Sequence, residues 1–138
     1  MTVAVRYFSR SGNTKKVAEA IASAAGVEAK TVDSPLEEKT DILFLGSAVY
    51  AAGVDPAISD FIKNNSAKIG KIANFSTAAV ISSTYRQVKK IAEENNVCIL
   101  EKEFHCKGKF AVMHTSHPDE NDLNSAKDFA KAVISAGV

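Results

Sequence analysis

The sequence has little of what a small secreted protein relies on, since its 138 residues include only two cysteines, three prolines and no tryptophan. Cys98 and Cys106 are too few for a disulfide framework. Both lie in or near one predicted strand, which disfavours a local disulfide, and their spacing is not that of a C-x-x-C redox motif. We therefore expect a reduced, cytoplasmic protein.

Charge of one sign and long apolar runs are also missing. Seventeen Lys and Arg face sixteen Asp and Glu, a formal net charge of +1, so no bulk field attracts nucleic acid or anionic lipid. The longest apolar run, residues 42–49, is far short of the roughly 20 residues that a membrane span needs. The first eight residues include Arg6 and lack the pattern of a signal peptide. We expect neither a nucleic-acid nor a membrane partner.

What is present is the composition of an ordinary globular protein, with 46% hydrophobic and 24% charged residues. The length suits one domain, and no linker, repeat or low-complexity segment divides it. We expect a single domain over residues 1–138, and a monomer.

Predicted strands and helices alternate along the chain. Gly26 is expected to end the first helix as a left-handed C-cap, and Asp55 to cap the second helix. Thr84 and Gln87 are expected to form a capping box on the third helix, and Asp119 to cap the last. The predicted strands are 3–8, 27–32, 42–47, 75–81 and 98–104, and the helices are 14–25 and the segments that begin near 56, 84 and 120.

This alternation predicts βαβ units and a parallel sheet with helices on both faces. The first, third and fourth strands are continuously apolar, as interior strands are, whereas the second and fifth carry charges typical of edges. The fold class is therefore α/β, a three-layer αβα doubly wound five-stranded sheet of order 2-1-3-4-5. Ligands in such sheets bind beyond the carboxyl ends of the strands, between the first and the third.

The first loop at this switch point is rich in small polar residues. Glycine allows close approach of the backbone, and the N-terminus of the following helix offers N–H groups to an anion. The loop lacks the patterns of triphosphate and dinucleotide sites, so a terminal phosphate suits it better; a simple turn that caps the helix is the alternative. The loop is Ser9, Arg10, Ser11, Gly12, Asn13 and Thr14.

At this loop the sequence resembles the flavodoxin family, whose [ST]-x-[ST]-G-N-T motif holds the phosphate of FMN. Residues 9–14 match every defined position, with Arg10 at the variable one. Five βα units and the Leu45-Gly46-Ser47 end of the third strand extend the similarity over the whole chain. The resemblance implies FMN as cofactor and residues 9–14 as its phosphate site.

The resemblance also implies two loops around the flavin ring. Tyr50 occupies the position of a ring contact in the second loop, and Tyr85 is the candidate in the third. A surface tyrosine at 50, and Thr84 as a mere cap with Tyr85 packed on the sheet edge, are the alternatives. The second loop is Ser47, Ala48, Val49, Tyr50, Ala51, Ala52 and Gly53, and the third is Ser82, Ser83, Thr84 and Tyr85.

The implied function is that of an FMN-binding electron carrier, shuttling electrons between redox partner proteins without a catalytic side chain. A small FMN-dependent reductase that passes hydride from a nicotinamide to a quinone, and a binding module that has lost FMN, are the alternatives. His114 and His117 share one loop without helical spacing, so we expect no metal site. Because Arg10, Lys15 and Lys16 lie in or beside this loop in a nearly neutral chain, we expect a less negative reduction potential than in acidic flavodoxins.

Overall fold

The computed structural model of the chain describes residues 1–9, 12–48, 54–78, 83–107 and 118–136. A parallel sheet in the order β2-β1-β3-β4-β5, with β6 also paired to β4, runs through the centre. This confirms the strand order expected from the apolar and charged runs. The strands are β1 (Val3–Tyr7), β2 (Ala29–Thr31), β3 (Thr40–Ala48), β4 (Ile69–Ala78), β5 (Cys98–Ile99) and β6 (Phe104–Lys107).

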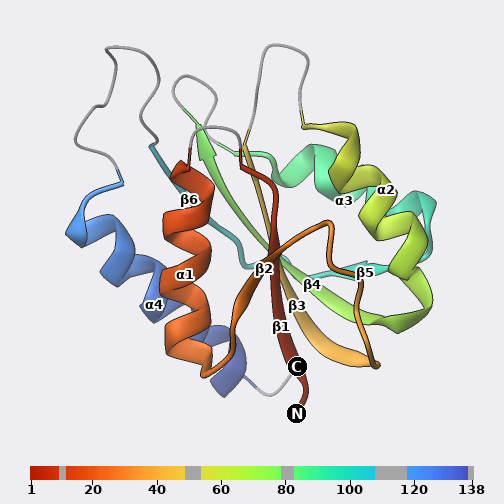
Figure 1. Cartoon of the computed structure of the whole chain (residues 1–138), viewed down its shortest axis with the longest axis horizontal. Coiled ribbons are helices and arrows are strands. Elements are labelled where there is room, and N and C mark those ends of the chain that lie inside the picture. Colours follow the sequence, from red (N-terminus) through yellow and green to blue (C-terminus); the bar gives the residue numbers. More distant parts are fainter. Residues whose placement is uncertain (10–11, 49–53, 79–82, 108–117, 137–138) are drawn as a thin grey trace.

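Helices cover both faces of the sheet, α1 and α4 on one side and α2 and α3 on the other (Figure 1). The three-layer αβα architecture is thereby confirmed. The helices are α1 (Asn13–Ala25), α2 (Pro56–Asn65), the short 3-10 helix η1 (Ser66–Lys68), α3 (Tyr85–Glu94) and α4 (Glu120–Ser135).

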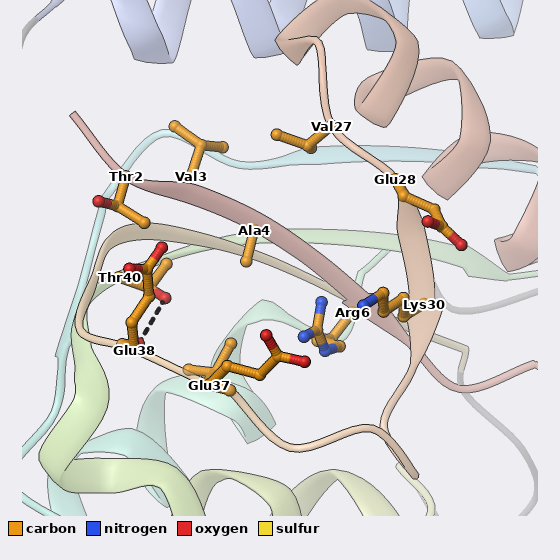
Figure 2. Close-up of a pocket in the computed structure, with 11 residues that line it drawn as sticks. Thr2, Val3, Ala4, Arg6, Val27, Glu28, Lys30, Glu37, Glu38 and Thr40 are labelled. Atoms are coloured by element: carbon orange, nitrogen blue, oxygen red, sulfur yellow. Dashed lines mark hydrogen bonds between the residues drawn. The ribbon is translucent and has the colours of Figure 1, made fainter.

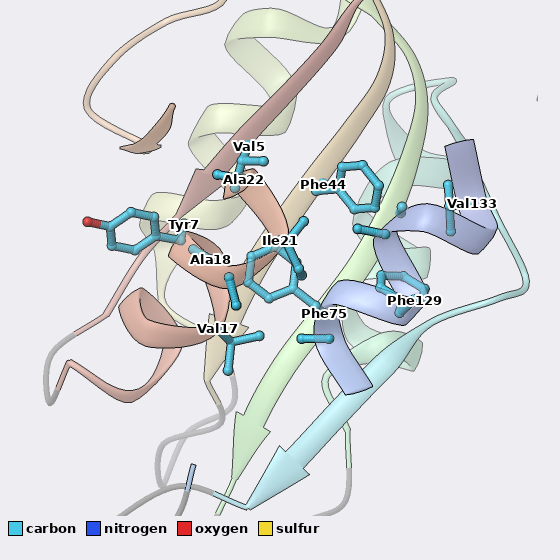
Figure 3. Packing of buried hydrophobic residues seen from close by; sticks show 14 of the residues in the cluster. Val5, Tyr7, Val17, Ala18, Ile21, Ala22, Phe44, Phe75, Phe129 and Val133 are labelled. Carbon is cyan, nitrogen blue, oxygen red and sulfur yellow. The ribbon is translucent and has the colours of Figure 1, made fainter. Parts of the chain in front are cut away.

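The core consists of two hydrophobic clusters separated by the sheet. Phe44 and Phe75 point toward α1 and α4, where Phe44 meets Phe129 edge-on with ring centroids 5.9 Å apart (Figure 3). The alternate residues Leu43 and Leu45 pack against α2 and α3. Because β3 is buried on both faces, both of its alternating sets must be apolar, which explains its continuous apolar run.

Three of the predicted caps are confirmed. Gly26 ends α1 in the left-handed region with φ 72°. Asp55 accepts a hydrogen bond from the Ala57 N–H at 2.9 Å at the start of α2. Asp119 and Asp122 form a reciprocal capping box on α4. Each cap satisfies backbone groups that have no partner within the helix.

The fifth strand is not continuous over 98–104, as predicted, but broken into β5 and β6. Ile99 pairs with Ile72, and Phe104 pairs with Phe75. Four residues lie between Ile99 and Phe104, whereas only two lie between their partners on β4. The two extra residues form a bulge at 100–103, in which Glu101 and Lys102 are exposed. Such bulges occur at sheet edges because no further strand has to pair there.

The fourth strand begins earlier than predicted, at Ile69 rather than at residue 75. Lys71 and Asn74 interrupt the apolar pattern of this segment. The segment is a strand nevertheless, because eight residues of β3 pair along it, from Thr40 opposite Ile69 to Ala48 opposite Thr77. Pairing with a long neighbour thus outweighs local hydrophobicity.

Candidate functional site

The carboxyl ends of β1, β3 and β4 meet at one edge of the sheet, as expected for a doubly wound fold (Figure 1). Nine of the predicted site residues are described there, and they are Ser9, Gly12, Asn13, Thr14, Ser47, Ala48, Ser83, Thr84 and Tyr85. The predictions that lie outside the described residues concern Arg10, Ser11, Val49, Tyr50, Ala51, Ala52, Gly53 and Ser82.

The first loop turns sharply at Gly12, directly before α1. The Gly12 N–H donates to Ser9 Oγ at 2.9 Å, and Gly12 has φ 88°, a left-handed conformation that L side chains rarely adopt. A Cβ at this position would have no described atom within 4 Å, so it would project into open space. No described side chain caps α1 at this end. An open helix N-terminus behind a glycine has the geometry and the dipole that suit a phosphate group.

Thr14 is buried beneath this turn, and its hydroxyl lies 2.9 Å from that of Thr77 on β4. Each hydroxyl has one hydrogen to donate and two lone pairs to accept. When Thr77 donates to Thr14, the Thr14 hydrogen remains available to an anion. We did not predict Thr77 from the sequence, because its role depends on the pairing of β4 with β3, which brings it next to α1.

The second and third loops meet at Thr84, which is fully buried. Ser47 Oγ donates to Thr84 Oγ1 at 2.9 Å, and Asn74 Nδ2 donates to the same atom at 3.2 Å. The Thr84 N–H donates to Ser76 Oγ at 3.3 Å. The network ties the end of β3 and the middle of β4 to the start of α3. Asn74 Oδ1 is the one buried side-chain polar atom in the described part of the chain without a partner.

The capping box predicted for Thr84 and Gln87 is wrong. Thr84 has helical dihedral angles, φ −89° and ψ −1°, rather than the extended ones of a side-chain cap, and its hydroxyl is engaged by Ser47 and Asn74. Ser83 Oγ instead accepts from the Tyr85 N–H at 3.0 Å. Gln87 Oε1 accepts from the Val54 N–H at 2.9 Å, outside the helix.

A carboxylate from the edge strand also reaches the third loop. Ser83 Oγ donates to Glu103 Oε1 at 2.6 Å, and the other carboxylate oxygen lies 2.8 Å from His105 Nδ1. We expected Glu103 to be an ordinary charge of an edge strand. Its position comes from the bulge at 100–103, which brings this side chain within reach of Ser83.

A surface pocket of about 210 Å³ lies away from this edge, beside the first half of β1 (Figure 2). Arg6 contributes a buried guanidinium to it, which donates to the carbonyl oxygens of Ser34, Pro35 and Val5 at 2.8, 3.3 and 3.0 Å. Burial lowers the pKa of Arg6. Since these donors bind backbone carbonyls, Arg6 anchors the connection between β2 and β3, and the pocket is not the predicted site.

Neither cysteine forms a disulfide; Cys98 is exposed and Cys106 is half-buried. Burial, with smaller contributions from Asp122 and Asp119, raises the pKa of the Cys106 thiol to about 12. Within the described ranges, no three His, Cys, Asp or Glu side chains are grouped to hold a metal ion, and no helix is long and apolar enough to cross a membrane. His114 and His117 lie outside these ranges.

The sheet order, the helices on both faces and the glycine turn before α1 define a doubly wound α/β protein. The flavodoxin domain family matches residues 4–114, so the chain belongs to this family. Its members are FMN-binding flavoproteins that transfer electrons to redox partner proteins, and FMN is the cofactor of this chain.

Individual proteins agree with this assignment. An uncharacterized protein from Methanocaldococcus jannaschii is 29% identical over 136 residues, covering 88% of this chain and 90% of the relative. The structure of a flavodoxin from the domain Archaea superimposes with a TM-score of 0.80 at 19% identity, covering 99% of this chain and 98% of that one. Flavodoxin 1 from Bacillus cereus gives a TM-score of 0.75 at 18% identity and 98% coverage of both chains. These two structures have the same fold as this chain.

Proposed function

We propose that this chain is a flavodoxin-type electron carrier that passes electrons between redox partner proteins and binds the FMN phosphate in the loop around Gly12. The observation that carries the proposal is the left-handed Gly12 directly before α1, at which a Cβ would have no described atom within 4 Å. Bound FMN supplies the electron-transfer chemistry, while the protein supplies binding, orientation and electrostatics. No catalytic acid, base or nucleophile is needed.

Each part of the site has a separate task in this proposal. Ser9 orients the turn through the Gly12 N–H, and Thr14, supported by Thr77, offers a hydroxyl to the phosphate. Tyr85 at the start of α3 contacts the flavin ring. The other proposed cofactor contacts remain those expected from the sequence in residues 9–14, 47–53 and 82–85. We propose that the carrier works as a cytoplasmic monomer.

Two glycines at opposite ends of α1 provide a matched test of the phosphate site. Gly12 and Gly26 have φ values of 88° and 72°, and a Cβ at either would have no described atom within 4 Å. Alanine at either position therefore costs a similar 1–2 kcal/mol of folding free energy, because it is held in a left-handed conformation. Only the Cβ of Gly12→Ala projects into the space that the phosphate needs.

We expect Gly12→Ala to weaken FMN binding at least tenfold and Gly26→Ala to leave it within twofold of the wild type. Quenching of FMN fluorescence measures the affinity, and urea unfolding measures the stability of each variant. Equal affinities for FMN in the two variants would show that the phosphate does not bind in this loop. A wild-type protein that neither quenches FMN fluorescence nor takes up FMN would refute the carrier function itself.

A further inference from the structure

The start of α3 binds two residues that flank positions 49–53, which lie outside the described residues. Ser47, the first residue of the second loop, donates to Thr84 Oγ1 at 2.9 Å. Val54, the residue that follows this loop, donates its N–H to Gln87 Oε1 at 2.9 Å. Thr84 and Gln87 are the N-cap and the third residue of the same helix. One helical turn therefore binds both Ser47 and Val54.

The two bonds differ in their surroundings. Thr84 is fully buried and also binds Asn74 and Ser76, so it belongs to the packed junction between the sheet and α3. Gln87 is half-buried, and in the described part of the chain its side chain forms one hydrogen bond, to Val54. Gln87 can thus be changed without opening the core.

The bond to Val54 replaces a bond that would serve the helix. A Gln at the third position of a helix commonly binds the backbone N–H of the N-cap residue, but here the Thr84 N–H goes to Ser76. Ser83 Oγ accepts the Tyr85 N–H instead. Ser76 and Ser83 therefore accept the N–H groups at the start of α3. The Gln87 side chain is left to bind Val54, which follows the second loop.

We infer that Gln87 is a positioning residue for the flavin site: by holding Val54, it fixes the exit of the second loop against the helix that begins with Tyr85. The inference rests on the proposed function, because residues 47–53 contact FMN only if this chain uses the loop as its family does. Gln87 itself does not need to touch the cofactor. Its contribution is to fix Val54, the residue that follows the loop, before FMN binds.

Three variants separate positioning from general stability. Gln87→Met keeps the unbranched shape and removes the acceptor, while Gln87→Glu keeps an oxygen that can accept the Val54 N–H. Lys90→Met, at an exposed position on the same helix, controls for the methionine substitution. FMN affinity is measured by fluorescence quenching at 0.5 M salt, which confines charge effects to a few ångströms. Amide hydrogen exchange of Val54 is measured without FMN.

We expect Gln87→Met to accelerate Val54 exchange and to weaken FMN binding about tenfold, equivalent to ~1.4 kcal/mol. Gln87→Glu should restore Val54 protection and most of the affinity, and Lys90→Met should change neither quantity. Wild-type affinity in Gln87→Met, or an equal loss in Lys90→Met, would overturn the inference. If the wild-type protein does not bind FMN, the proposed function fails. If Val54 exchange is unchanged in Gln87→Met, Gln87 does not hold Val54, and the inference fails whether or not the protein binds FMN.

Discussion

At the scale of single residues, partly buried polar groups take their roles from their surroundings. Arg6 lies in a strand where an apolar residue would be expected, yet its donors bind three backbone carbonyls and hold the connection between β2 and β3. Cys106 is instead kept in its neutral form, since burial and the carboxylates of Asp122 and Asp119 all disfavour its thiolate. A thiol reacts through its thiolate, so Cys106 should be inert.

This environment predicts different reactivity for the two cysteines. With iodoacetamide near neutral pH, we expect the exposed Cys98 to be alkylated in the native protein and Cys106 only after unfolding in urea. Mass spectrometry of the peptides measures both sites. Labelling of Cys106 as fast as that of Cys98 in the native protein would contradict the raised pKa.

The same pKa predicts a loss of stability at high pH. The ordinary thiol pKa is 9.0 and the folded value is about 12. Between these values the unfolded chain releases the proton and the native protein retains it, so the free energy of unfolding falls as pH rises. Urea unfolding at pH 8 and 10.5 should therefore show a smaller decrease for Cys106→Ala than for the wild type. Equal decreases would show that Cys106 does not titrate in this way.

At the scale of elements, the ring of Phe75 on β4 lies where a side chain on Gly46 of β3 would have to be. Gly46 pairs with Phe75, and a Cβ on Gly46 would lie 2.2 Å from Phe75 Cε2. This contact is far inside van der Waals distance, and Phe75 is fully buried, so its ring has little room to move. The phenylalanine ring therefore fills the space above the glycine.

We expect Gly46→Ala to lower the free energy of unfolding by about 1–3 kcal/mol through overpacking. Phe75→Leu removes the ring atoms that the new methyl group would meet. In that background, Gly46→Ala should cost at least 1 kcal/mol less than in the wild type, which a double-mutant cycle by urea unfolding measures. An identical cost in both backgrounds would show that the strain lies elsewhere.

At the scale of the whole molecule, the near-balance of charge distinguishes this chain from acidic flavodoxins. Negative groups around a flavin disfavour its anionic, fully reduced form, whereas positive groups favour it. The formal charge is +1, and the exposed Lys15 and Lys16 lie in the first turn of α1 beside the proposed phosphate loop. Unit charges 10 Å apart in water interact by roughly 0.4 kcal/mol before salt screening.

We therefore expect the reduction potential of bound FMN to be less negative than in acidic flavodoxins, and replacement of Lys15 and Lys16 by Gln to make it more negative. Lys131→Gln, an exposed change in α4, should leave it unaltered. A spectroscopic redox titration at low salt measures all three proteins. A potential equal to or below that of acidic flavodoxins in the wild-type protein would refute the prediction.

Much of the fold follows from local sequence. The apolar runs at 3–8, 42–47 and 75–81 placed three strands inside the sheet, because a strand covered on both faces has no polar side to show. Charged residues marked the edges. The proposed phosphate loop rests on a contiguous motif, and its glycine adopts the left-handed conformation that favours glycine.

The remainder depends on neighbours that are distant in sequence. Thr77, Glu103 and Gln87 have ordinary local sequences, and their partners Thr14, Ser83 and Val54 are brought to them by strand pairing, the bulge at 100–103 and the packing of α3. The strand order and the position of the switch point follow from the sequence alone, because they depend on periodicity and on contiguous residues. Which hydroxyls and amides meet around the proposed site becomes visible in the folded chain, because a hydrogen bond requires two groups to lie within about 3 Å.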